Sequence, residues 1–237
     1  MNGTESERNE RSDAVARPPE LSFALLSLGE IDTTLCDWSS EEIQKQLPTE
    51  ILLITANDYE FTASYSYMKN VKRIHTDSLG KVDFGHFDDN IVRVALILCE
   101  QGPLSAALTA KNAAEILRPK AIVFVGICAT MKPEKAKLGD VVVSAKLATY
   151  ADKKVREDDT VEYRGAKEKV SRNMGKLILS AAQGWQPPLK DPTSLSVQVH
   201  RDAVMLSGPE LVNNLERRQE LANYFQDAIG LEMEGAG

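Results

Sequence analysis

Two glutamates near the end of this sequence stand where a carboxylate could do chemistry. Glu232 and Glu234 flank Met233, and all three follow the short apolar run at residues 229–231. This order indicates a strand with acids at its carboxyl end, and ligands of open α/β sheets bind at such ends. Carboxylates there could hold a water molecule or stabilise positive charge on a substrate. The ordinary alternative is two solvated acids at a helix start, where they complement the helix dipole.

Glu60 is a third acid in a comparable place, because it follows the continuous apolar run at residues 51–56. Its spacing from Asn57 also fits a capping box, in which the glutamate at the third helical position bonds back to the cap. From spacing alone, capping is the simpler interpretation. A role in binding or catalysis stays open beside it.

Two further strand exits carry small or polar residues. Residues 126–130 follow the apolar run 121–125, and residues 207–210 are expected to open a helix after another strand. The 126–130 turn is a weak phosphate loop, because Gly126 is its only glycine and such loops need several. Cys128 has no convincing base beside it. The three histidines are dispersed without ligand spacing, so we predict no metal site and no cofactor.

The elements that position these residues follow a βα alternation from residue 50 onward. Apolar runs such as 51–56 and 121–125 are typical of strands buried on both faces, and the alternation predicts an α/β fold. Pro103 suits the first position of a helix. We expect helices at 58–69, 103–117, 173–182 and 209–225, strands within 71–98 and at 121–125, 139–144, 203–207 and 229–231, and a surface excursion at 150–170.

The amino-acid composition argues against some classes of function. The 237 residues are 43% hydrophobic and carry a net charge of −7, which argues against nucleic-acid or anionic-membrane partners. No apolar run approaches the ~18 residues of a membrane span. Three cysteines and a polar amino terminus predict a reduced, cytoplasmic protein. We divide the chain into a disordered leader (1–20), a linker or helical edge (21–49) and one large domain (50–237).

Taken together, these segments resemble the nucleoside phosphorylase superfamily, and within it most closely the methylthioadenosine/S-adenosylhomocysteine nucleosidases. The resemblance is carried by residues 54–60, 94–96, 120–129, 138–144 and 232–234. The most specific pieces are 139–144 and 232–234. The resemblance implies a three-layer αβα fold with a twisted mixed sheet, and cleavage of the N-ribosidic bond of a purine nucleoside.

The resemblance also implies a role for individual residues. Glu60 matches the glutamate that activates the attacking water, and Glu234 matches the one that binds the ribose hydroxyls, with Met233 packed on the sugar. The 126–130 turn would line the ribosyl and nucleophile site. Leu211 falls where relatives place an aromatic side chain against the purine. The implied substrate-binding residues are therefore Gly126, Ile127, Cys128, Leu211, Met233 and Glu234, with Glu60 catalytic.

Water is favoured over phosphate as the nucleophile. Hexameric phosphorylases carry an arginine two residues before the glycine that matches Gly126, and this chain has Phe124 there. The 126–130 turn is also poorer in glycine than in the nucleosidases, which predicts a reshaped nucleophile pocket. A phosphorylase stays a second alternative, after a module that senses a nucleoside or nucleotide without turnover.

In relatives, an aspartate on the following strand protonates the departing purine. We expect that this sequence stops before that strand and before the helices that complete the sheet. The apolar strands 121–125 and 229–231 should then lie partly open. The full-length form is expected to be a homo-oligomer.

Overall fold

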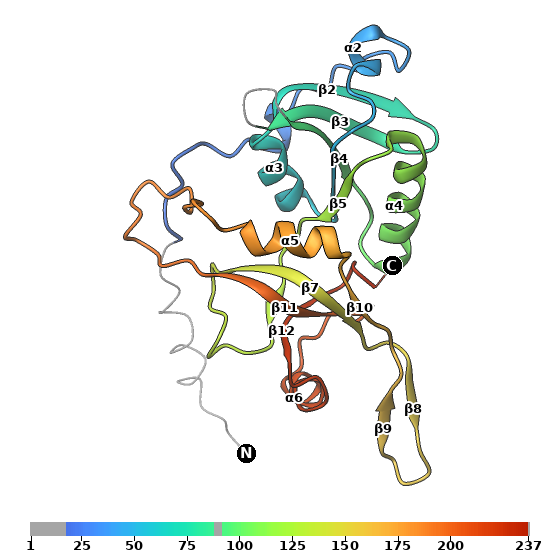
Figure 1. Ribbon diagram of the computed structural model, residues 1–237, viewed down its shortest axis with the longest axis vertical. Coiled ribbons are helices and arrows are strands. Elements are labelled where there is room, and N and C mark those ends of the chain that lie inside the picture. The colour runs from blue at the N-terminus through green and yellow to red at the C-terminus, as the bar shows by residue number, and fades with distance from the viewer. Residues whose placement is uncertain (1–17, 88–91, 237) are drawn as a thin grey trace, which may run out of the picture.

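The computed structural model describes residues 18–87 and 92–236, which form two five-stranded mixed sheets with helices packed around them (Figure 1). Residues 1–17 of the predicted leader and Gly237 lie outside the described residues. The predicted α/β class with mixed strand pairing is confirmed. Ten of the described strands lie in these two sheets, which the chain joins between residues 124 and 129, and the other two form a separate hairpin.

The first sheet has the strand order β2-β3-β4-β1-β5. Central strand β1 pairs in parallel with β4 and β5, and the hairpin β2–β3 adds antiparallel pairs on the outer side. The strands are β1 (Ile51–Thr55), β2 (Lys69–Thr76), β3 (Gly80–Phe87), β4 (Val92–Leu98) and β5 (Ala121–Phe124).

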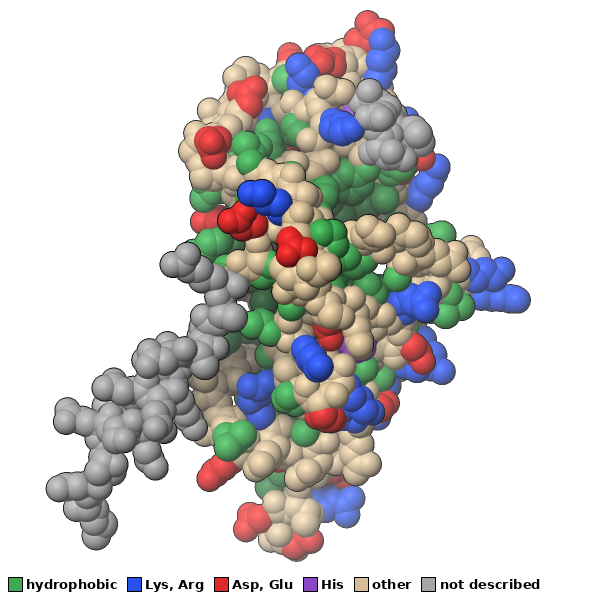
Figure 2. All heavy atoms as spheres, turned by 90° about the vertical axis from the view of Figure 1, so that its left-hand side faces the viewer, with side chains coloured by type: hydrophobic (Ala, Val, Ile, Leu, Met, Phe, Trp, Pro, Cys, Tyr) green, Lys and Arg blue, Asp and Glu red, His purple; other side chains and the backbone are tan. Residues whose placement is uncertain are grey.

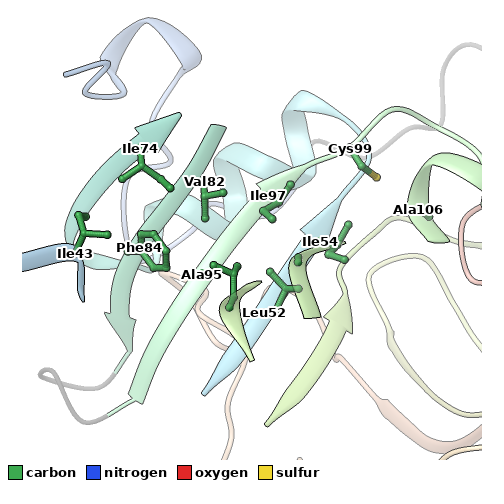
Figure 3. Packing of buried hydrophobic residues seen from close by; sticks show 12 residues of the cluster. Ile43, Leu52, Ile54, Ile74, Val82, Phe84, Ala95, Ile97, Cys99 and Ala106 are labelled. Carbon is green, nitrogen blue, oxygen red and sulfur yellow. The ribbon is translucent and has the colours of Figure 1, made fainter. Parts of the chain in front are cut away.

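Helices cover both faces of the first sheet and give it three layers. Side chains alternate between the two faces of a strand. Accordingly, Leu52 and Ile54 share a buried cluster with Ala106 of α4 (Pro103–Leu117), whereas Leu53 packs with Phe61 of α3 (Asp58–Ser66). Figure 3 shows the first of these clusters spreading across β1, β3 and β4. Glu60 therefore lies on a helix that covers one face of this sheet.

The second sheet has the order β10-β7-β11-β12-β6, with β11 parallel to β7 and β12. Helix α6 packs onto it through the fully buried Leu221, which joins Leu206 and Leu231 in a cluster, and α5 lies against β7 and β11. The elements are β6 (Ala129–Thr130), β7 (Val141–Thr149), β10 (Lys167–Lys169), α5 (Arg172–Ser180), β11 (Val199–Ser207), α6 (Leu215–Tyr224) and β12 (Ala228–Glu232).

The sequence prediction was wrong about the helix expected at 209–225, which begins only at Leu215. Asn214 caps it, because its side chain accepts a hydrogen bond from the backbone N–H of Arg217 at 2.8 Å. Residues 209–214 have no helical structure. The Asn214 side chain bonds a backbone N–H that has no partner within the helix, so the helix begins directly after this residue. Leu211 therefore lies on a loop between β11 and α6.

The surface excursion expected at 150–170 contains a hairpin of β8 (Lys153–Val155) and β9 (Val161–Tyr163), followed by β10. The hairpin projects away from the second sheet (Figure 1). The strand predicted at 139–144 continues to Thr149, so β7 is longer than its apolar run suggested.

The conspicuous pair Gly139-Asp140 has a structural explanation. The Asp140 carboxylate accepts hydrogen bonds from the backbone N–H groups of Lys137 and Gln198, both at 2.9 Å, and lies 3.0 Å from Nε2 of His200. Gly139 has a φ of 92°, which side-chain-bearing residues rarely adopt. These contacts tie the start of β7 to the start of β11.

The segment before β1 packs on the domain. It contains the short helices η1 (Leu28–Glu30) and α2 (Glu41–Gln44), and the Ser40 side chain caps α2. Ile43 is fully buried in the cluster of the first sheet, and the N–H of Cys36 donates to the carbonyl of Arg73 at 2.7 Å. The assignment of 21–49 as a linker or helical edge stays a prediction.

On the face drawn in Figure 2, acidic and basic side chains are interspersed, with hydrophobic side chains visible between them. Such a surface has no field of one sign on this face that would attract a polyanion. Within the described ranges, no helix is both long and apolar enough to cross a bilayer.

Candidate functional site

Glu60 lies in the first turn of α3, directly after the carboxyl end of β1. Its Oε2 accepts a hydrogen bond from the backbone N–H of Ala56 at 3.0 Å, and its Oε1 accepts one from Ile127 at 2.9 Å. Asn57 caps the helix by accepting from the N–H of Glu60 at 3.0 Å. The cap is therefore made by Asn57, while the Glu60 carboxylate bonds to the residue before the cap and to another loop. This arrangement fixes the carboxylate between two strand exits.

The 126–130 turn lies against Glu60, as the resemblance implies. A Cβ atom added at Gly126 would lie 3.2 Å from Glu60 Oε1, tighter than an ordinary contact, so a side chain there would shift the carboxylate by a few tenths of an ångström. Ile127 donates its N–H to Glu60, while its side chain is 74% exposed. The turn thus contributes backbone to the candidate site.

Glu232 ends β12 and folds back onto the chain that follows it. Its carboxylate accepts hydrogen bonds from the N–H of Glu234 at 2.7 Å and of Gly235 at 2.9 Å. The Glu232 carbonyl also accepts from the N–H of Gly208 at 3.4 Å, which brings the exit of β11 beside the exit of β12. Glu232 therefore holds the turn that presents Glu234.

Glu234 is half-buried and shares its surroundings with Glu60. Burial raises the pKa of its carboxyl, and the negative charges of Glu232 and Glu60 raise it further. Hydrogen bonds from the backbone of Gly102 and from Met233 oppose that rise. The charges of Glu234 and Glu60 also act on Cys99. Burial is the main cause that raises the pKa of its thiol, and these two charges raise it further. The exits of β1, β4 and β12 therefore lie within electrostatic range of one another.

Cys128 faces the second sheet. A Cβ added at Gly230 of β12 would lie 3.3 Å from Cys128 Sγ, so the thiol packs over that glycine. Burial and then Glu232 raise the pKa of this thiol. A thiol whose pKa is raised is a poor nucleophile, and a role for Cys128 in the site stays a prediction.

Leu211 and Met233 stay predictions as substrate contacts. Leu211 is 83% exposed on the loop between β11 and α6. Met233 is half-buried between the two glutamates. Neither side chain has a polar group that would identify a ligand.

Sequence reasoning missed the connection between β4 and α4. Gly102 has a φ of 105° and precedes Pro103, which begins α4 as predicted. Its backbone amide reaches Glu234 across the seam between the sheets. A glycine in the short connection between a buried strand and a helix was the signal available, because such a turn brings backbone amides to the carboxyl edge of a sheet.

A cavity of about 270 Å³ lies elsewhere, between the segment before β1 and the first sheet. Arg73 and Asp83 line it and form a buried two-pronged ion pair, with N–O distances of 2.8 and 2.9 Å. None of the candidate site residues lines this cavity. Within the described ranges, no group of three or more His, Cys, Asp or Glu side chains could hold a metal ion.

Known proteins share this sequence pattern. The chain is 30% identical over 151 residues to a death domain-containing ATP nucleosidase from Amphimedon queenslandica, covering 58% of this chain and 28% of that protein. It is 26% identical over 162 residues to a 5′-methylthioadenosine/S-adenosylhomocysteine nucleosidase from Maridesulfovibrio salexigens, covering 68% of this chain and 66% of that protein. The chain thus spans under a third of the first relative and 66% of the second.

Solved structures share the fold. The nucleosidase of Neisseria meningitidis, bound to methylthio-immucillin-A, matches with a TM-score of 0.62 at 19% identity, over 79% of this chain and 77% of that chain. The adenine-bound nucleosidase of Colwellia psychrerythraea matches with a TM-score of 0.64 at 17% identity, over 79% and 74%. The resemblance to nucleosidases seen in the sequence is confirmed. The family model of the phosphorylase superfamily matches residues 50–237, and the chain therefore belongs to that superfamily.

Proposed function

We propose that this protein hydrolyses the N-ribosidic bond of a purine nucleoside or nucleotide. The observation that carries the proposal is the Glu60 carboxylate, held by the N–H groups of Ala56 and Ile127 and sharing its electrostatic surroundings with Glu234. The relatives that are named nucleosidases, one acting on ATP and one on methylthioadenosine or S-adenosylhomocysteine, support the reaction class.

The chemistry assigns each glutamate a task. Cleavage passes through a state in which the ribose carries positive charge, as in glycoside hydrolysis. Glu60 orients a water molecule and accepts its proton as the water oxygen bonds to C1′ of the sugar. Glu234 binds the ribose hydroxyls, and its negative charge stabilises the developing cation. The bond from C1′ to the purine nitrogen breaks, and the base leaves with a proton. We assign that last proton to no residue of this chain.

Phosphate is the less suitable nucleophile. Phe124, which is 41% exposed at the end of β5, stands where the resemblance places a phosphate-holding arginine in phosphorylases. An anion beside the Glu60 and Glu234 carboxylates needs a cation to offset their charges. The proposal therefore favours free ribose, or ribose phosphorylated only at the 5′ position, as the second product.

The test is adenine release from adenosine, methylthioadenosine and ATP, each with and without inorganic phosphate. We expect release that does not depend on phosphate, and a loss of about 100-fold or more in Glu60→Gln, the usual size of general-base effects. Glu115→Gln, which removes an exposed acid of α4, is the matched control. Ribose 1-phosphate as the product would establish a phosphorylase instead. Nucleoside binding without any release would establish the sensing alternative.

The predicted homo-oligomer is also part of the proposal. Leu104 and Leu108 of α4 are 74% and 52% exposed, and their i,i+4 spacing puts them on one face of the helix beside the site. A second copy of this chain would cover them. Sedimentation should show an oligomer that Leu104→Glu dissociates and that Leu215→Glu, at an exposed leucine of α6, leaves intact. A wild-type monomer would end this part of the proposal.

We place the protein in the cytoplasm. The three cysteines Cys36, Cys99 and Cys128 are all unpaired, which supports a reducing compartment. Fractionation of cells that express the protein tests this placement.

A further inference from the structure

Two neighbouring arginines of α6 reach the two loops that the sequence assigned to the site. Arg217 binds the Glu210 carboxylate with two parallel hydrogen bonds, from Nε at 2.9 Å and from a terminal nitrogen at 3.0 Å. Arg218 donates to the backbone carbonyl of Thr130. Glu210 belongs to the loop before α6, and Thr130 closes the 126–130 turn. One helix therefore contacts both loops.

Arg217 is itself held in place. Its side chain is 17% exposed and also bonds the Glu220 carboxylate at 2.7 Å. The guanidinium lies 5.7 Å from the ring centre of Tyr150 and 5.8 Å from that of Tyr163, within reach of cation–π attraction. The hydrogen bond to Glu210 raises the pKa of Arg217 first, with Glu220 and Tyr163 adding to it. Such a fixed cation differs from a mobile surface ion pair.

The loop that Arg217 contacts is fastened at a second point. Tyr150, fully buried directly after β7, donates its hydroxyl to the Glu210 carbonyl at 3.2 Å. A Cβ added at Gly208 would lie 2.6 Å from the Tyr150 ring, so the backbone lies flat against it. Leu211 follows Glu210 directly. The place of Leu211 thus depends on contacts to both the backbone and the side chain of Glu210.

Arg218 acts on the other side of the site through the backbone. Thr130, whose carbonyl it binds, lies three residues after Ile127, and Ile127 donates its N–H to Glu60. Pairing of β6 with β12 holds Thr130 opposite Gly230. The Arg218 contact therefore fixes one end of the turn whose other end fixes the Glu60 carboxylate.

We propose that Arg217 and Arg218 are positioning residues that hold the Leu211 loop and the 126–130 turn in fixed relation. Arg217 places the surface that receives the purine, and Arg218 places the turn that holds the water-activating carboxylate. This inference rests on the proposed function for its consequences in catalysis. Its structural part, the separate fastening of two loops by one helix, is independent of that function.

Kinetics separate the two roles. Arg217→Gln should raise KM for the nucleoside by about tenfold or more with kcat nearly unchanged, because it loosens base binding. Arg218→Gln should lower kcat by about tenfold or more with KM nearly unchanged, since small displacements of catalytic groups cost that much or more. Arg218→Lys, which can still donate to the Thr130 carbonyl, should retain most of the activity. Arg156→Gln, which breaks a 2.8 Å ion pair in the β8–β9 hairpin, is the matched control.

Amide hydrogen exchange tests the inference even if the protein releases no adenine. Arg217→Gln should speed exchange at residues 208–214 while residues 126–130 keep the wild-type rate, and Arg218→Gln should do the reverse. Exchange that changes equally in both loops, or in neither, overturns the inference. An inactive wild type whose two loops respond separately would reject the proposed function and leave the fastening of the loops established.

Discussion

The two sheets differ in how completely they are covered. In the first sheet, Val94, Ala95 and Leu96 of β4 have no exposed surface, with α3 and α4 on opposite faces. In the second sheet, β7 is half-buried along most of its length, and Val141 is 38% exposed. The candidate site lies on the seam between the two sheets, with Glu60 from the first and Glu232 and Glu234 from the second. Glu60 thus comes from the sheet whose β4 has a fully buried stretch, and the other two glutamates come from the sheet whose β7 is half-buried.

Leucine truncations should give the largest difference between the two halves. Leu52→Ala, at a fully buried position of β1, should lower the free energy of unfolding by about 2–5 kcal/mol. Leu177→Ala, at a 64% exposed position of α5, should change it by less than about 0.5 kcal/mol. Urea unfolding of both variants measures this. A large loss in Leu177→Ala would mean that α5 buries this leucine in solution and that the second sheet is better covered than the comparison states.

Substitutions of Glu232 and Glu234 should separate an effect on ligand binding from an effect on stability. Glu234→Gln should weaken adenosine binding by about 1.5–3 kcal/mol, because it removes a charged partner of the ribose hydroxyls. Glu232→Gln should leave binding almost unchanged and lower stability by about 1 kcal/mol, since its carboxylate holds the amides of Glu234 and Gly235. Calorimetry and thermal melting measure the two effects. Equal losses of affinity would remove the assignment of Glu234 to the ribose.

Helix caps offer a matched test on the two halves. Asn57→Ala removes the cap of α3, whose side chain bonds the N–H of Glu60, and Ser171→Ala removes the corresponding cap of α5 at Met174. Each should cost about 0.5–2 kcal/mol of stability. Only Asn57→Ala should also slow adenine release, because Glu60 lies in the turn that this cap holds. Equal activity in the two variants would show that the contacts to Ala56 and Ile127 alone fix Glu60.

The sequence predicted the first half of the molecule better than the second. Strand β1 and helix α4 have long, regular patterns, and Pro103 begins α4 as expected. The helix start before α6 was misplaced, because Pro209 is a stronger start signal than Asn214 when tertiary contacts are unknown. The contacts of Glu210 with Arg217 and Tyr150 hold residues 208–210 in a loop.

The candidate site likewise has parts that the sequence predicted and parts that it missed. The meeting of Glu60, the 126–130 turn and Glu234 could be expected from strand ends. The approach of the Gly102 amide to Glu234 could not be expected, because it depends on how the first sheet lies against the second. The strands expected to lie open also differ: Val123 and Phe124 of β5 are 38% and 41% exposed, whereas Leu231 of β12 is 6% exposed under α6. Leu231 is covered because α6, which directly precedes β12, packs back onto the second sheet through Leu221.

The smallest effect concerns the pH dependence of stability at the seam. Burial raises the pKa of Glu234 above its ordinary value of 4.5, so the folded protein keeps a proton that the unfolded chain has already released. The stability that the protonated carboxyl contributes is fully present below pH 4.5 and is lost as the pH rises through the folded pKa. Glu234→Gln keeps a neutral side chain at every pH. It should therefore melt slightly above the wild type at pH 7, and the difference should vanish below pH 4.5.

Glu115→Gln on α4, at an exposed position, is the control and should shift the melting temperature little at either pH. A variant Glu234→Gln that melts below the wild type at pH 7 would contradict the reasoning, because the Gly102 and Met233 amides would then stabilise the charge more than burial disfavours it. The sign matters for function. At neutral pH the negative charge of Glu234 destabilises the protein without substrate. When a ribose that develops positive charge is bound, the carboxylate gains an opposite charge beside it. Part of the free-energy cost of the buried carboxylate is therefore recovered only in the reacting complex.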